Sequence, residues 1–189
     1  MLSPILSKVI NVVLYQIGWF SCILGAALGF PLCGAFVSLT LVVLHLLLTD
    51  ARKVEVRLLF AACVLGIVVD SLQQAAGLFT FKTDPSWPLW LPLWVFVIWI
   101  QFATLLRFAL HWLSERYLLG ALFGAIGGPL AYWSGIRLGA ATFGGNPQLT
   151  LLVLALVWAL VTPLLLWARH KLAGSEGHYH WFSERYTDA

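Results

Sequence analysis

The sequence predicts an all-α protein, a polytopic membrane bundle of six transmembrane helices with both termini in the cytoplasm. Of its 189 residues, 61% are hydrophobic and 10% are charged, whereas a soluble domain is about 45–50% apolar and about 25% charged. The apolar residues form six runs with short loops between them, and a bilayer helix needs about 20 such residues. Basic residues gather on one side of these runs. Together these observations exclude a water-soluble globule.

The hydrophobic runs cover residues 7–29, 31–49, 56–79, 90–113, 117–141 and 149–169. Each run has to be helical, because in hydrocarbon only a helix pairs all of its own backbone groups. Pro31 can begin the second helix, since the first turn of a helix does not need its N–H. Residues 1–173 are therefore expected to form one six-helix transmembrane domain, and residues 174–189 a polar cytoplasmic tail.

The orientation follows from the positive charges, which are enriched on the cytoplasmic side of membrane proteins. One side of the predicted bundle has only Lys82 and Arg137. The other side holds Lys8, Arg52, Lys53, Arg57, Arg107, Arg116, Arg169, Lys171 and Arg185. This distribution predicts a multi-pass membrane protein whose two termini face the cytoplasm. Because the basic residues lie at the ends of apolar runs, they indicate topology, and we expect no nucleic-acid partner.

Asp70 is the carboxylate expected deepest within a span. An ionisable side chain at that depth costs at least about 2.5–3.5 kcal/mol, so it marks a candidate site. Gln73 and Gln74 follow it one turn later, which places a polar face toward the bundle interior. Arg107 and Arg137 are its candidate partners. A depth count at about 1.5 Å per residue favours Arg107, and we expect an Asp70–Arg107 ion pair.

The fourth run adds further polar side chains on one face. Gln101, Thr104, Arg107 and His111 fall on about one third of its surface at helical periodicity. With His45 on the second run, they could line a cavity that opens toward the cytoplasm. For His45 alone, a hydrogen bond between helices is the simpler interpretation.

Two rows of glycine predict close helix contacts. Gly120, Gly124 and Gly128 recur every four residues in the fifth run, and Gly18 and Gly25 lie on one face of the first run. Small residues let helix backbones approach closely in a bilayer. We expect these two faces to pack against each other.

No motif for hydrolysis, phosphate binding or dinucleotide binding is present. The chain gives no reason to expect a cofactor or a metal. His178 and His180 could bind a metal only with a third ligand, and a solvated tail is the simpler interpretation. An enzyme is possible on these residues, but nothing in the sequence supports it.

Several segments resemble a known family. They are Gln16–Gly25, Asp70, Pro92–Trp94, Phe102–Thr104 and Gly127–Gly135. Together they resemble the bacterial inner-membrane family catalogued as domain of unknown function 2878, over nearly the whole chain up to the polar tail. The resemblance implies an association with the modification of membrane fatty acids, and it assigns no catalytic or binding residue.

Three hypotheses for function remain. The first is a protein that binds or moves a small amphiphilic or lipid-like molecule, or assists a membrane-lipid modification system; it predicts a lipid-sized pocket that reaches Arg107. The second is an integral-membrane enzyme acting on a lipid-like substrate, with Asp70 or His111 as the acid–base group. The third is a packing subunit for a membrane-protein partner, whose polar or glycine face would stay exposed to lipid.

Overall fold

The structure is a computed structural model that describes residues 3–173. The residues 174–189, and with them the predicted tail, Arg185, His178 and His180, lie outside the described part. Six α-helices, one short 3₁₀ helix and two short strands follow in chain order. They are α1 (Pro4–Ala27), α2 (Pro31–Leu48), α3 (Arg52–Ala75), β1 (Phe79–Phe81), α4 (Leu93–Leu105), η1 (His111–Leu113), α5 (Tyr117–Arg137), β2 (Ala141–Phe143) and α6 (Pro147–Ala173).

The helical fold class is confirmed, and four of the described helices are long and apolar enough to cross a membrane. These are α1, α2, α5 and α6. Helix α3 has 24 residues, but its first six include four charged ones. Helix α4 has 13 residues, fewer than the about 20 that a full crossing requires. The chain is therefore a membrane protein with a helical bundle.

The predicted fourth helix, residues 90–113, is too long. Helix α4 ends at Leu105, and the next residues form turns in which the Leu110 N–H bonds to the Leu105 carbonyl at 2.8 Å. The chain then enters the 3₁₀ helix η1. Arg107 lies in these turns, and its buried side chain forms an ion pair with a carboxylate described below. A uniform apolar run does not reveal such a break.

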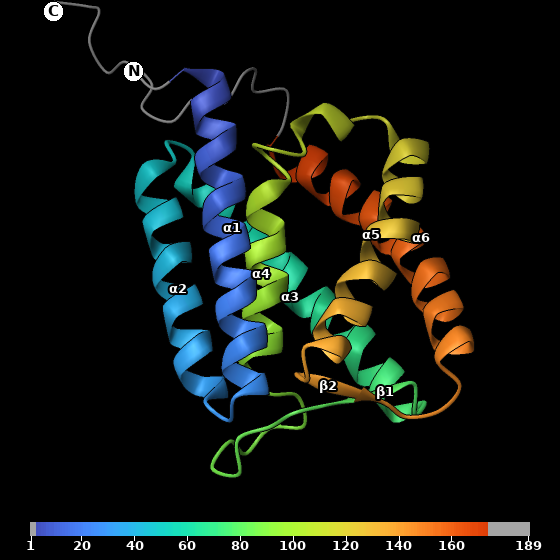
Figure 1. The fold of residues 1–189 in the computed structure, drawn as a ribbon. Helices are drawn as coiled ribbons and strands as arrows, with labels where there is room; N and C mark the ends of the chain where they lie inside the picture. The colour runs from blue at the N-terminus through green and yellow to red at the C-terminus, as the bar shows by residue number, and fades with distance from the viewer. Residues whose placement is uncertain (1–2, 174–189) are drawn as a thin grey trace, which may run out of the picture.

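Two short strands are the exception to an otherwise helical fold. Strand β1 pairs with β2 antiparallel, with Phe79 opposite Phe143 and Phe81 opposite Ala141. In Figure 1 this pair closes the lower end of the bundle, where α3 and α5 end. Strands occur here because they belong to the connections between helices, where backbone groups pair with each other outside the helical core.

The helices form two groups. Helix α1 packs against α2 and α4, and α3 packs against α4, while α5 packs mainly against α6. Contacts between α3 and α6 join the two groups. Figure 1 shows α1, α2 and α4 on one side and α5 and α6 on the other, with α3 crossing behind them. Successive helices run in opposite directions, so α1 begins and α6 ends at the same end of the bundle.

Glycines make the contacts within each group. On α1, Gly25 lies against Gly34 of α2: a Cβ on Gly25 would stand 2.9 Å from the Gly34 Cα. On α5, the row Gly120, Gly124 and Gly128 faces Leu166, Thr162 and Trp158 of α6. Gly18 of α1 lies against Gln101 of α4 and Ser38 of α2. The expected contact between the two glycine rows is therefore wrong, because each row faces other helices. The role of these glycines as packing residues stays a prediction, and these close contacts are consistent with it.

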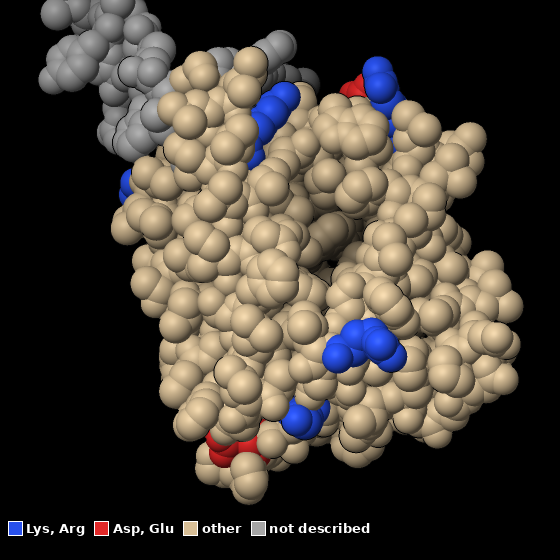
Figure 2. Space-filling model, in the orientation of Figure 1, with Lys and Arg blue, Asp and Glu red and all other residues tan. Residues whose placement is uncertain are grey.

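Most of the surface is apolar, as a lipid-facing protein requires. Large hydrophobic residues are exposed along five of the described helices, all but α4, for example Phe60 at 70%, Leu118 at 77% and Leu160 at 74%. On the face in Figure 2, the charged side chains gather toward the two ends and leave an uncharged band between them. Such a band matches the hydrocarbon layer of a bilayer.

The glycine contact between α5 and α6 predicts a position-specific loss of stability. A Cβ on Gly124 would collide with the Trp158 carbonyl oxygen and the Thr162 side chain, and the backbone atom cannot move away cheaply. We expect Gly124→Ala to lower the free energy of unfolding by about 1–3 kcal/mol, the usual cost of overpacking. Unfolding in mixed detergent micelles measures this quantity.

The matched control is Gly127→Ala, one turn along the same helix. A Cβ there would meet only Phe123 at 3.9 Å, so this variant should be as stable as the wild type or more stable, because alanine favours helix. Equal stabilities for the two variants would contradict the packing described here.

Candidate functional site

A cavity of about 190 Å³ lies between the two helix groups. Its walls come from α1, α4, α5 and α6, with Asp70 contributed by α3 and the strands at one end. Figure 2 shows a hollow on this face, between the two charged ends. The lining consists of aromatic, small and aliphatic residues together with Asp70 and Thr162. The aromatic members are Tyr15, Trp19, Phe81, Trp94, Trp99, Phe102, Phe123, Tyr132 and Trp158, and the small ones include Gly124, Gly127, Gly128, Ala131 and Gly135.

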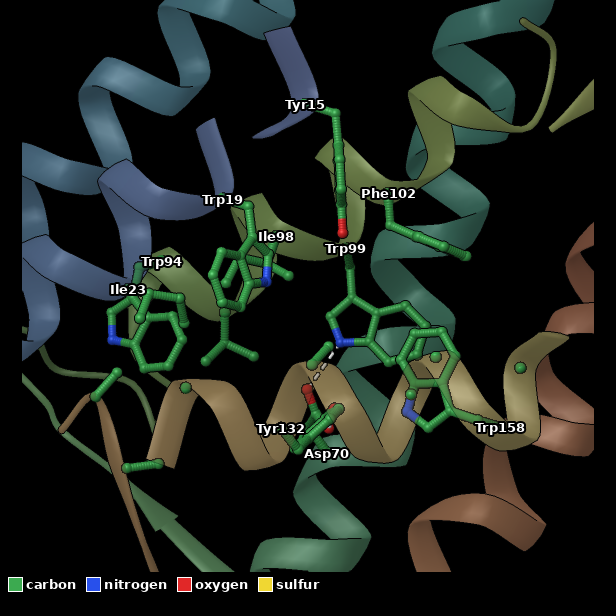
Figure 3. Close-up of a pocket in the computed structure, with 18 of the residues that line it drawn as sticks. Tyr15, Trp19, Ile23, Asp70, Trp94, Ile98, Trp99, Phe102, Tyr132 and Trp158 are labelled. Carbon is green, nitrogen blue, oxygen red and sulfur yellow. Dashed lines mark hydrogen bonds between the residues drawn. The ribbon is translucent and has the colours of Figure 1, made fainter. Parts of the chain in front are cut away.

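Asp70 is the acidic residue of the cavity lining and is 1% exposed. Its Oδ2 accepts a hydrogen bond from the indole N–H of Trp99 at 2.7 Å, and its Oδ1 accepts one from the hydroxyl of Tyr132. Figure 3 shows Asp70 beside Tyr132 and below Trp99, with the Trp99 bond dashed. The carboxyl group is thus held by donors from α4 and α5, while it belongs to α3.

Two glycines allow the large rings to reach these positions. The Trp99 ring lies where a Cβ on Gly66 would be, one turn before Asp70 on α3. In the same way the Trp158 ring occupies the Cβ position of Gly128, one turn before Tyr132 on α5. The two indoles stack with ring centroids 4.9 Å apart and planes at 13°. A glycine one helical turn before Asp70, and another one turn before Tyr132, therefore leaves room for an indole ring beside each of these polar residues.

The predicted pair between Asp70 and Arg107 is wrong. Arg107 Nη1 donates to Glu55 Oε2 at 2.6 Å, and both side chains are fully buried. The other Glu55 oxygen, Oε1, lies 2.9 Å from His45 Nε2. The depth count failed because it assumed one continuous fourth helix and placed Glu55 outside its span. In the structure Glu55 is 0% exposed, and its carboxylate pairs with the Arg107 guanidinium in place of Asp70.

The other predicted site residues occupy three separate places. Gln101 donates from Nε2 to the Ser38 carbonyl and hydroxyl at 3.1 and 3.0 Å, and so ties α4 to α2. The Thr104 hydroxyl donates to the Gln101 carbonyl at 2.7 Å. His111 lies in η1, where its Nδ1 is 2.8 Å from Arg169 Nη2. These residues, with His45 and Arg107, do not line the cavity described above.

The two glutamines of α3 also differ from each other. Gln74 accepts from the Phe81 N–H at 3.2 Å and donates to the Trp90 carbonyl at 3.4 Å, so it holds the end of β1 and the loop before α4. Gln73 is 5% exposed, and its amide atoms have no hydrogen-bond partner among the described residues. Neither lines the cavity. Their role in ligand binding stays a prediction.

Three candidate functional residues were not predicted from the sequence: Glu55, Trp99 and Tyr132. Glu55 does carry a signal, because it shares the buried face of α3 with Ala62, Gly66 and Asp70 at helical spacing. Trp99 and Tyr132 carry none, since an aromatic residue in an apolar run is equally consistent with core packing. Their donor groups become relevant only when the fold brings them to Asp70.

The described residues contain no group of three or more His, Cys, Asp or Glu side chains that could hold a metal ion. The candidate pair His178 and His180 lies outside those residues. The cavity itself offers one carboxyl group, hydroxyl groups and indole N–H groups, which can bind a polar group of a small molecule by hydrogen bonds.

The Glu55–Arg107 pair predicts a large loss of stability when its charge balance is removed. We expect Glu55→Gln to lower the free energy of unfolding by about 3–5 kcal/mol, because it leaves a buried guanidinium without a carboxylate. Denaturation in mixed micelles, followed by circular dichroism, measures the change.

Asp50→Asn provides the control, since Asp50 is exposed and its Oδ1 only accepts from the Ala51 N–H. It should change the free energy of unfolding by no more than about 0.5 kcal/mol. A Glu55→Gln protein as stable as Asp50→Asn would remove Glu55 from this role.

Comparison with known proteins gives one family. The sequence model of a family described as "Protein of unknown function (DUF2878)" matches residues 8–164, which confirms the resemblance seen in the sequence. No curated protein matches significantly. No solved structure does so either.

Proposed function

Because the chain belongs to the DUF2878 family, whose function is unknown, we propose a function from the cavity: the protein binds a small amphiphilic or lipid-like molecule taken from the bilayer. The single observation that carries this proposal is an aromatic cavity with one buried carboxyl group, positioned between two helix groups. Ligand sites are mostly apolar with a few placed polar groups, and this cavity has that composition.

The size of the cavity limits what it can hold. An apolar protein cavity of about 150 Å³ is large enough for benzene, so a volume of about 190 Å³ accommodates one ring or a short branched chain. A longer molecule would extend through the mouth along the apolar surface between α1 and α5. The hollow lies in the uncharged band of Figure 2, and a ligand could thus enter from the hydrocarbon layer.

The finer membrane topology is part of this proposal. We propose that all six helices cross or enter the bacterial inner membrane, with the start of α1 and the end of α6 both on the cytoplasmic side. Arg52, Lys53 and Arg57 at the start of α3 support it, because α3 begins at the end of the bundle where α1 begins. Alkaline phosphatase, which is active only outside the cytoplasm, should be inactive when fused after residue 173; an active fusion would reverse the orientation.

A catalytic role is the second candidate, favoured by one observation. The hydrogen-bonded Asp70 and Tyr132 place a carboxyl group and a phenol in the cavity, within reach of a bound molecule. Both residue types serve in general acid–base catalysis. A lipid extract whose masses change with the wild type, and not with Asp70→Asn, would establish an enzyme. A packing subunit for a membrane-protein partner is the third candidate, although the glycine row on α5 is already covered by α6.

Filling the cavity should remove the ligand. Gly127 lines the cavity and has open space at its Cβ position, where only Phe123 comes within 3.9 Å. We expect Gly127→Leu to reduce co-purified amphiphile about tenfold or more, because overpacking costs about 1–3 kcal/mol and each 1.4 kcal/mol is a factor of ten. Native mass spectrometry of protein extracted in a mild detergent measures the occupancy.

Ala125→Leu is the matched control. Ala125 is half-buried on the same helix and does not line the cavity, so its substitution should leave the occupancy unchanged. Equal occupancy in the wild type and both variants would count against binding at this site.

A further inference from the structure

The carboxyl group in the cavity lacks a cation of its own. Ion pairs within the described residues involve Glu55 and Glu115, and none involves Asp70. Among the residues that the structure describes, the cavity lining likewise contains no Lys, Arg or His. An ionised carboxylate is costly in an apolar interior unless it is paired. Asp70 therefore differs from Glu55, whose charge is offset by Arg107.

The hydrogen bonds of Asp70 leave room for another donor. A carboxylate offers about four acceptor positions on its two oxygens. Trp99 and Tyr132 each use one of them, one on each oxygen. Both donors are neutral, so they reduce the desolvation cost without cancelling the charge. A positively charged donor in the cavity would find free acceptor positions on a group that is already oriented.

Thr162 supplies a second, independent observation. Its side chain lines the same cavity and is 0% exposed, and its hydroxyl has no hydrogen-bond partner among the described residues. A buried polar group without a partner carries a penalty of about 1–3 kcal/mol. A ligand with N–H groups could donate to this oxygen or to Asp70. A quaternary ammonium ion has no N–H and could do neither.

The walls of the cavity suit a cation with an apolar body. Trp99 and Trp158 form a stacked pair, and Phe102 meets Trp158 edge-on with centroids 5.4 Å apart. In Figure 3 Trp19 lies on the opposite side of the space from Trp158, and the Tyr15 hydroxyl points toward it from above. Aromatic rings attract organic cations through their negative faces and also pack against an apolar body.

From these observations we propose that the cavity binds a lipophilic organic ammonium ion, a primary or secondary amine in its protonated form, with the N–H groups on Asp70 and the apolar part against the tryptophans. This inference rests on the proposed function and names the charge of its ligand. A zwitterionic phospholipid fits less well, because its phosphate would enter a cavity without any basic residue.

Three probes of nearly the same shape test the charge. Phenethylammonium, 2-phenylethanol and propylbenzene share a phenyl ring and a two-carbon arm, and they end in an ammonium, hydroxyl or methyl group. Their affinities for the full chain are measured by calorimetric titration in dodecyl maltoside, which is uncharged. The ratio of wild-type to variant affinity is compared for each probe, because partition into the micelle then cancels.

For Asp70→Asn we expect a loss of about tenfold or more for phenethylammonium, the size of one hydrogen bond to a charged group. The loss should be within about twofold for the other two probes. Asp84→Asn is the control: it makes the same charge change in an exposed loop, where the Asp84 Oδ1 accepts bonds only from Ser86, and it should leave all three affinities unchanged. Equal losses for the three probes, or none, would overturn the inference.

A second variant covers the case in which Asp70→Asn does not fold. Thr162→Val has the same shape without the hydroxyl and should weaken phenethylammonium several-fold and propylbenzene not at all; an equal effect on both would also overturn the inference. If propylbenzene binds the wild type and phenethylammonium does not, the ammonium assignment fails while the proposed binding function stands. If no probe binds, both fail.

Discussion

In a bilayer, each buried polar group has to find its partner within the protein or in a ligand, because hydrocarbon offers none. This constraint organises the structure. Near one end, Glu55 of α3 contacts Arg107 and His45, so that a negative charge is balanced where α2, α3 and the turns after α4 meet. Further along the same face of α3, Asp70 receives two neutral donors instead. One helix face thus carries one carboxyl group in an ion pair and one that is held by neutral donors.

The division into two helix groups follows from where the small and large residues lie. Glycines bring α1 close to α2 and α5 close to α6, since each pair meets through backbone contacts. Between the pairs stand Trp19, Trp99, Tyr132 and Trp158, whose rings hold α1 and α4 apart from α5. Small residues therefore lie within each helix pair, and aromatic rings lie between the pairs. This arrangement leaves a cavity at the level of the uncharged surface band.

Much of the fold could be predicted from the sequence, because apolar runs, Pro31 and the glycine rows are local signals. The inward direction of Asp70 was predictable as well, since helical spacing places it on a small-residue face with Gly66. The end of α4 at Leu105 was not, because the turns that follow it are as apolar as a helix. The partners of Asp70 were missed for a different reason, because Trp99 and Tyr132 become its donors only through contacts between helices that are distant in the sequence. In addition, the arginine expected to pair with Asp70 pairs with Glu55, at the charged start of α3.

The account centres on a cavity between two helix groups, with Asp70 bound to Trp99 and Tyr132 at its base. The most direct measurement is an electron cryomicroscopy structure of the protein in lipid nanodiscs, enlarged by a rigid antibody fragment. We expect non-protein density in the cavity against the tryptophans, with the carboxyl group of Asp70 contacting both donors. A structure in which α1 and α5 close the space, or in which Asp70 contacts Arg107, would contradict it.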